Sequence, residues 1–245
     1  YRSDHIFEPA IAPMVTGDLK INDTIKSAED KKTFAFDIFN GAVGFLNACY
    51  AAAGMIRADR AKTAMIVTAE AANGSENFAK KAYDFEETGS ALVLDESPDE
   101  EAGFGDFVFK YFPAYRDDLK VMVKPGCESP EIEIHKDPAL YDHYIECIPG
   151  VVQELLDKQG LDMSQIKIIF PPQISSQFIS KLGTKMNLPE DKFVDATING
   201  KDIFTSSIPY AMRYAKDNNL IGTGDTGLII SVGSGIQVGC ATYHF

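Results

Sequence analysis

The first part of the chain contains short apolar runs of strand length on either side of one helical pattern. Phe34 to Phe39 is aromatic and β-branched and is followed by Asn40-Gly41, which predicts a buried strand that ends in a turn. Val43 to Ile56 is rich in alanine and leucine with few polar residues, as in a helix that is buried nearly all round. Thr63 to Ala69 and Ser90 to Leu94 predict further strands, the first of them covered on both faces.

The second part of the chain alternates between strands and amphipathic helices. Phe104 to Phe112 has the alternation of a strand, and Tyr141 to Gln159 has apolar residues at helical spacing with Gly160 as its stop signal. Further predicted elements are a strand at Ile166–Phe170, helices at about Ser175–Met186 and Ser206–Asp217, and strands at Thr226–Val232 and Gln237–Tyr243. This order indicates an α/β fold with helices on both faces of mostly parallel sheets.

An acidic run, Asp95 to Glu101, separates the two parts and has the composition of a solvated connection. We therefore expect two halves, residues 1–101 and 102–245.

Net charge limits the kinds of partner that we expect, and cysteine content indicates the cellular compartment. The 245 residues carry a formal net charge of −13, which disfavours binding to nucleic acid or an anionic membrane surface. No apolar run approaches the roughly 20 residues of a membrane span. The four scattered cysteines (Cys49, Cys127, Cys147, Cys240) form no CxxC pair, so we expect reduced thiols and a cytoplasmic location.

Two motifs are better explained without a cofactor or a metal. The glycine loop Gly233-Ser234-Gly235 is followed by a β-branched strand, whereas a dinucleotide fingerprint needs a helix there, so we expect a tight strand-to-strand turn. His143 and Cys147 are four residues apart on one predicted helix, but no third metal ligand lies nearby in the sequence. We predict neither a metal nor a resident cofactor.

The turn between residues 39 and 43 is the strongest candidate for chemistry. A strand that turns sharply into a buried helix places the turn residue at the helix N-terminus, where N–H groups and the helix dipole stabilise negative charge. Acyl-transfer enzymes often seat a nucleophile at such a position, because the same field lowers the pKa of a thiol.

Together with other segments along nearly the whole chain, this turn resembles the β-ketoacyl-ACP synthase III group of the thiolase superfamily. The segments that carry the resemblance occur in the family's order: Ala35-Phe36-Asp37-Ile38 with Ala42-Val43-Gly44-Phe45, Phe85 to Ala91, Pro171 to Ser175, Lys201 to Pro209, and the glycine hairpin from Val232 to Phe245. The resemblance implies a thiolase fold of two pseudo-repeated α/β halves, layered αβαβα. It also implies that the first half is incomplete, because the family's opening strand and helix would lie before Tyr1.

The departures from the family pattern fall on its catalytic triad. The positions that match the family's Cys, His and Asn are Ala42, Pro172 and Asp202. Alanine is no nucleophile, proline has neither a ring nitrogen to titrate nor an N–H, and an ionised aspartate would repel the oxyanion that asparagine stabilises. We therefore expect the Cys-dependent chemistry to be lost. Cys49 lies about two helical turns, or about 10 Å, beyond Ala42, too far to replace the missing nucleophile.

Other parts of the family's site have partial counterparts. The resemblance implies a backbone oxyanion hole at Ala42 and at Gly233, Ser234 and Gly235, so a carbonyl group or carboxylate of acyl-CoA or acyl-ACP would still bind. The family's basic residue at the substrate entrance falls at Gln177, and Lys80 and Lys81 either supply part of that charge or form an ordinary solvated pair. Asp202 follows residues that predict a loop, so its side chain is either solvated or acts as a general base. In the second case, analogy with the family places Glu86, Glu87 or Ser175 nearby.

Three functions remain open at this point. The first is a non-catalytic partner or scaffold in fatty-acid or polyketide-type biosynthesis, as a homodimer or as a heterodimer with an active paralogue. The second is an acyltransferase or 3-oxoacyl synthase with a rearranged site, and the third is a binding protein that keeps the acyl cavity.

Overall fold

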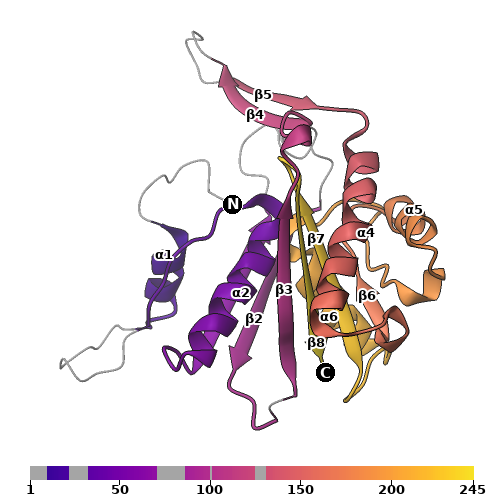
Figure 1. The fold of residues 1–245 in the computed structure, drawn as a ribbon. Coiled ribbons are helices and arrows are strands. Elements are labelled where there is room, and N and C mark those ends of the chain that lie inside the picture. Colours follow the sequence, from indigo (N-terminus) through magenta and orange to yellow (C-terminus); the bar gives the residue numbers. More distant parts are fainter. Residues whose placement is uncertain (1–9, 22–32, 71–85, 100, 125–130) are drawn as a thin grey trace.

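The computed structural model describes residues 10–21, 33–70, 86–99, 101–124 and 131–245 (Figure 1). The expectations for Lys80, Lys81 and Cys127 lie outside these residues. No helix within the described ranges is long and apolar enough to cross a membrane.

A four-stranded sheet organises the second half of the chain. Its order is β3-β8-β7-β6, and its members are β3 (Gly103–Tyr111), β6 (Ile168–Phe170), β7 (Thr226–Gly233) and β8 (Gln237–His244). β6 and β7 are parallel, while β8 is antiparallel to both of its neighbours. The expectation of mostly parallel sheets is therefore wrong for the described strands, because short returns such as the turn after Gly233 join neighbouring strands in opposite directions.

The first half contributes a separate two-stranded antiparallel sheet. β1 (Thr63–Glu70) pairs with β2 (Thr88–Asp95) in an unbroken register that sets Met65 opposite Val93. Ile66 faces the core, but Met65 is 44% and Val93 60% exposed. The expectation that the first of these strands is covered on both faces is therefore wrong within the described residues.

Helices fill the space between and around the sheets. They are α1 (Ile11–Asp18), α2 (Gly44–Arg57), α4 (Leu140–Gln159), α5 (Ser176–Met186) and α6 (Ser207–Asp217). α2 contacts β1 and β2 on one side, and the side chain of Leu46 reaches Gly239 of β8 on the other. α4 and α5 pack on the outer side of the four-stranded sheet (Figure 1). α4 ends as predicted at Gly160, which has the left-handed conformation that favours glycine at a helix C-terminus.

Two cores follow from this arrangement. One lies between α4, α5 and the four-stranded sheet, with fully buried Leu155, Ile169 and Leu228. The other surrounds α2 and α6, with Phe45, Phe170 and Ile229. A hairpin of β4 (Leu119–Lys124) and β5 (Glu131–Lys136) projects beyond both (Figure 1) and was not predicted.

The predicted strand at 34–39 is also wrong. Residues 33–40 have no regular secondary structure, and Phe34, Phe36 and Phe39 are 74%, 44% and 61% exposed. Asp37 of this segment instead accepts hydrogen bonds from the N–H groups of Ile11 and Ala12 at the start of α1. Aromatic and β-branched residues favour a strand only where another strand offers a ladder, and none of the described strands pairs with this segment.

Candidate active site

The turn before α2 places Ala42 at the start of a helix, as the sequence predicts. The expectation that this helix is buried nearly all round is wrong, because part of its surface is open to solvent and Tyr50 is 57% exposed. Gly41 to Val43 form a short 3₁₀ turn that runs directly into α2, and Gly41 has φ +48°. The Asn40 side chain donates to Oδ1 of Asn47 at 2.6 Å and also to the Gln237 side chain, which anchors the turn to α2 and β8. The turn is therefore fixed from two sides. Ala42, which the sequence resemblance matches to the family's nucleophile, contributes only a methyl group to it.

The glycine loop lies against this turn. Ser231 Oγ donates to the Ala42 carbonyl oxygen at 2.9 Å. A Cβ at Gly233 would lie 3.1 Å from Cγ2 of Val43, so only glycine allows this approach without displacement. Gly235 has φ +88°, and Ser234 at the tip is exposed. The expected tight strand-to-strand turn is confirmed, and the structure brings Gly233 and Ala42 together.

Pro172 lies in a buried loop after β6. Its neighbour Gln173 is fully buried, and its side chain makes three hydrogen bonds: Nε2 donates to the carbonyl oxygens of Pro171 (2.9 Å) and Val194 (3.0 Å), and Oε1 accepts from Ala196 N–H (2.7 Å). The Gln173 N–H donates to Ser207 Oγ at 3.3 Å. These bonds fix the loop against the start of α6.

Asp202 lies just before the 3₁₀ turn Phe204–Ser206, which contacts the turn at Ala42. Its Oδ1 accepts from Phe204 N–H at 2.7 Å, and its carbonyl oxygen accepts from Glu86 N–H at 2.9 Å. The side chain is partly buried, so the alternative of a solvated aspartate is wrong. The segments around Ala42, Gly233 and Asp202 therefore converge on one end of α2.

Burial has the largest effect on the pKa values of the carboxyl groups at this end of α2. It raises the pKa of the Asp202 carboxyl to about 7, and the nearby charge of Glu70 raises it further, while the hydrogen bond from Phe204 and the charge of Lys136 oppose the shift. Glu70 is 7% exposed, and burial raises its pKa as well, although its Oε1 accepts from Thr205 Oγ1 at 2.6 Å. Asp202 is therefore partly protonated near neutral pH.

Sequence reasoning missed Glu70 and Gln173. Glu70 is a charged residue directly after the apolar run at 63–69, and this position could have drawn attention to it. Gln173 lies within the family-like segment from Pro171 to Ser175, but its role could not be predicted because it depends on backbone groups that are distant in sequence.

Of the remaining candidates, Glu86 lies beside Asp202 through the hydrogen bond from its N–H, whereas Ser175 and Gln177 lie at the start of α5. Gln177 is exposed on α5, and Ser175 Oγ accepts from Phe178 N–H at 3.1 Å as the N-cap of that helix. The Glu86 side chain accepts from Asn199 Nδ2 at 3.2 Å and lies 3.8 Å from Lys201 Nζ, while Glu87 is exposed.

No described cysteine offers a reactive thiol. Cys49 and Cys240 are fully buried, and burial raises the pKa of both thiols far above the ordinary value. Burial likewise raises the pKa of Cys147 to about 11. At neutral pH all three are protonated and therefore poor nucleophiles.

His143 has a carboxylate and an aromatic ring as partners. Its Nδ1 lies 2.6 Å from Oδ2 of Asp118, and its ring stacks on Tyr115 with centroids 4.5 Å apart. No group of three or more potential metal ligands occurs among the described residues.

Comparisons with known proteins agree on one family. The model described as "3-Oxoacyl-[acyl-carrier-protein (ACP)] synthase III" matches residues 36–111, and the model of its C-terminal part matches 156–245. The chain is 24% identical over 227 residues to a β-ketoacyl-[acyl-carrier-protein] synthase III of Clostridium perfringens, covering 86% of this chain and 68% of that protein. A homologue from Ruegeria pomeroyi with the same description is 26% identical over 221 residues, with the same coverage.

Solved structures show the same fold. The crystal structure of β-ketoacyl-ACP synthase III from Thermus thermophilus superimposes with a TM-score of 0.82 at 22% identity, covering all of this chain and 75% of that one. The α/β fold therefore matches thiolase-fold structures over most of the chain. On these matches the chain belongs to the β-ketoacyl-ACP synthase III-like condensing-enzyme family of the thiolase superfamily.

Proposed function

We propose that this chain is a synthase III-like protein that does not perform Cys-dependent condensation and acts as a non-catalytic partner or scaffold subunit in fatty-acid or polyketide-type biosynthesis. The observation that carries the proposal is the turn before α2, whose residue Ala42 matches the family's nucleophile position by sequence resemblance and has only a methyl side chain. Pro172 and Asp202, which the resemblance matches to the other two triad positions, support it, and so does the burial of the three described cysteines.

The partner role is supported by apolar surface in the first half of the chain. Phe34, Phe36 and Phe39 lie exposed on one segment, with the first two rings 5.0 Å apart. Exposed aromatic side chains of this kind mark protein contacts more often than open solvent surface. We expect either a second copy of this chain or an active synthase paralogue to cover them.

The catalytic half of the proposal is tested by intact-mass measurement after incubation with acetyl-CoA and octanoyl-CoA. The native chain should form no acyl adduct and no 3-oxoacyl product with malonyl-ACP. Ala42→Cys should gain an adduct that peptide mapping assigns to position 42, because the helix N-terminus and the backbone around it are retained. Ala42→Ser is the matched control for added volume, and circular dichroism checks that all variants are folded.

An acyl adduct on the native chain, or turnover by it, would overturn the proposal. The partner half is tested by light scattering and by co-purification with a Cys-His-Asn synthase expressed alongside. Phe34→Ser combined with Phe36→Ser should abolish the association. A strictly monomeric native chain that retains no such synthase would contradict the partner role.

A second candidate, an acyltransferase with a rearranged site, is favoured by the pKa of about 7 at Asp202, which suits a general base at neutral pH. It requires thioester turnover by the native chain that rises with pH through about 7 and disappears in Asp202→Asn. Absence of turnover with acyl-CoA and acyl-ACP across pH 5 to 9 would exclude this candidate.

A further inference from the structure

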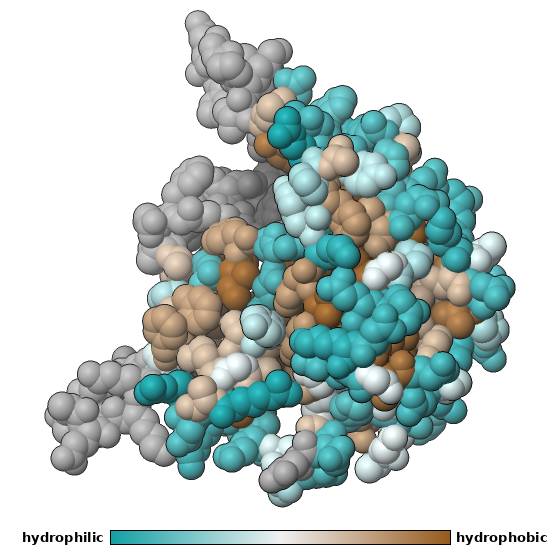
Figure 2. Space-filling model, in the orientation of Figure 1, coloured by the Kyte–Doolittle hydropathy of each residue, from teal (hydrophilic) through white to brown (hydrophobic). Residues whose placement is uncertain are grey.

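Each strand of the β4–β5 hairpin has an edge that pairs with no other strand among the described residues. The hairpin belongs to residues 112–155, which lie between the two family matches. In Figure 1 it stands clear of the body with β5 on its upper side, and Figure 2 shows hydrophobic and hydrophilic colours together on it. Two strands alone are only marginally stable in water, and further strands or a packed layer add stability.

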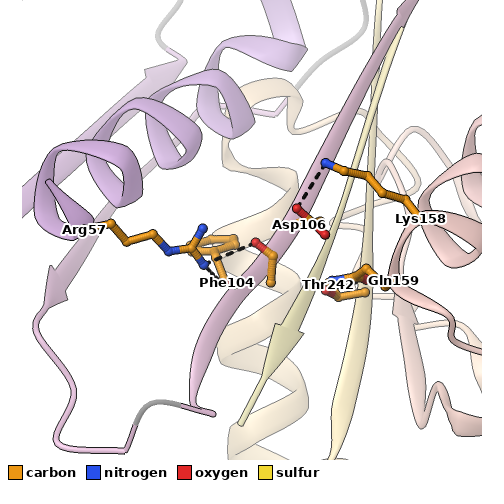
Figure 3. Close-up of polar contacts among 7 residues, drawn as sticks. Arg57, Phe104, Asp106, Lys158, Gln159 and Thr242 are labelled. Atoms are coloured by element: carbon orange, nitrogen blue, oxygen red, sulfur yellow. Dashed lines mark hydrogen bonds and ion pairs between the residues drawn. The ribbon is translucent and has the colours of Figure 1, made fainter.

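The neighbouring helix α4 does not supply that layer, because both of its ends are tied down. At its C-terminal end, Figure 3 shows Lys158 Nζ paired with Asp106 Oδ1 of β3, at 3.0 Å. At its N-terminal end, His143 Nδ1 lies 2.6 Å from Oδ2 of Asp118, at the root of the hairpin. An occupant for the free edge of β5 therefore has to come from another molecule.

The residues of β5 match a second copy of the same strand. In an antiparallel pair centred on Ile134, the two Ile134 residues lie opposite each other, and Glu133 of each copy lies opposite His135 of the other. Centring the pair on Glu133 would instead set two carboxylates face to face, which is destabilising. Glu133 and His135 are both exposed. β4 offers no such match, because all of its charged residues are lysines.

The local charge of the hairpin also permits contact between copies. With a net charge of −13, two copies of the chain repel each other over most of their surfaces. The strands β4 and β5 together carry three lysines against two glutamates, so they do not share this excess of negative charge. The hairpin is therefore a surface at which two copies approach without a large electrostatic penalty.

From this register we infer that β5 pairs antiparallel with β5 of a second copy of this chain and joins the two hairpins into one four-stranded sheet. Val121, which is 53% exposed, lies opposite Ile134 within the hairpin, so a row of four apolar side chains would cross the new sheet. Six residues per strand bury less than a standard interface, so the pairing is weak and depends on concentration. The inference is independent of the proposed function, because the contact at Phe34 and Phe36 is a different surface.

Disulfide crosslinking tests the register in a Cys127→Ser background, which keeps only the three buried cysteines of the native chain. Ile134→Cys should form an intermolecular disulfide on oxidation with copper–phenanthroline, because directly opposite Cα atoms are about 4.5–5.5 Å apart. Val121→Cys is the matched control. Its two copies would lie three strand spacings, or about 14 Å, apart and should stay uncrosslinked. Absence of the Ile134→Cys crosslink, or equal crosslinking of both variants, would overturn the inference.

Charge reversal tests the pairing without oxidation. Sedimentation of the Phe34→Ser/Phe36→Ser chain, at protein concentrations above those used for light scattering, measures the hairpin contact alone and should show a weak dimer. Adding Glu133→Lys should weaken this dimer about fivefold, and adding His135→Glu as well should restore it. A chain that stays monomeric in this background, or a dimer that Glu133→Lys leaves unchanged, would count against pairing through β5, whatever the outcome for the contact at Phe34 and Phe36.

Discussion

The two sheets of this molecule differ in how completely their faces are covered. The four-stranded sheet has α4 and α5 on one side and α2 and α6 on the other, and every residue of β7 from Gly227 to Gly233 is buried. The β1–β2 sheet packs one face on α2, while Met65, Val67 and Val93 share its other face and stay between 44% and 60% exposed. The strands are of similar length and composition, so coverage by helices, and not strand sequence, separates the two halves.

The difference indicates where stability and association reside. Residues between two layers lose most of their water-accessible apolar area on folding, which stabilises by roughly 25 cal/mol per Å². An apolar sheet face that stays exposed contributes little to the isolated chain and is available to a partner. We therefore expect the second half to carry the folding free energy and the first half to carry the contacts.

The largest expected effect comes from truncating matched side chains in the two regions. Leu155→Ala in the core of the second half should lower the free energy of unfolding by about 3 kcal/mol through lost burial and a residual cavity. Val93→Ala on the exposed face should change it by less than about 0.5 kcal/mol. Urea unfolding measures both. A loss of more than about 1.5 kcal/mol in Val93→Ala would show that this face is covered in the protein and would break the comparison.

Overpacking tests the junction between the halves. A Cβ at Gly239 would lie 2.9 Å from the Phe109 ring and 3.1 Å from the Leu46 side chain of α2, so Gly239→Ala should cost about 1–3 kcal/mol. Gly150→Ala in α4, with nothing within 4 Å of its Cβ, should instead gain about 0.5–1 kcal/mol. Equal effects in thermal unfolding would mean that α2 is not held tightly against β8.

The pH dependence of stability sharpens the comparison at Asp202. Because its pKa is raised in the folded state, the native chain keeps a proton that the unfolded chain releases, so the stabilising contribution of Asp202 is full at low pH and is lost as the pH rises from about 4 through about 7. From pH 5 to 8 we expect a loss of about 1–2 kcal/mol, below the full limit because Asp202 is partly exposed.

Urea unfolding at four pH values should show a flatter profile for Asp202→Asn, with the remaining slope due to Glu70, whose pKa is raised too. Glu96→Gln in the exposed acidic run is the control and should retain the native profile. If the unfolding free energy of Asp202→Asn kept the native dependence on pH, the titrating group would be a residue other than Asp202.

The smallest effect concerns the hydrogen bond from Ser231 Oγ to the Ala42 carbonyl oxygen. Ser231→Ala should cost about 1 kcal/mol, because it leaves a partly buried acceptor without its donor. Ser234→Ala at the exposed tip of the same loop should be neutral within about 0.5 kcal/mol. If the two variants are equally stable, the loop is not tied to the turn by this bond.

Most elements of the second half were predictable because burial and periodicity coincide there. The helical spacing from Tyr141 to Gln159 became α4, and Gly160 capped it as expected. Ser175 and the strands around Gly233 followed their local signals as well. Each of these segments meets a neighbour that uses its apolar face, so the pattern and the packing agree.

The errors fall where tertiary partners decide. Phe34 to Phe39 has strand composition but no described strand beside it, and strand pairing, unlike helix formation, needs a second segment. The hairpin β4–β5 was missed because it projects from the body, so no buried face imposes a clear alternation. For the candidate site, the sequence resemblance proposed Ala42, Pro172 and Asp202, but the raised pKa of Asp202 depends on its burial and on Glu70 and Lys136, which are distant in sequence.

Gln173 has a consequence for any attempt to engineer activity into this scaffold. Its amide ties Pro171, Val194 and Ala196 together through hydrogen bonds, and Pro172 lies beside it in the same buried loop. An imidazole introduced at position 172 would therefore stand on a backbone that these hydrogen bonds already hold in place, so engineering would have to supply the ring and not the loop.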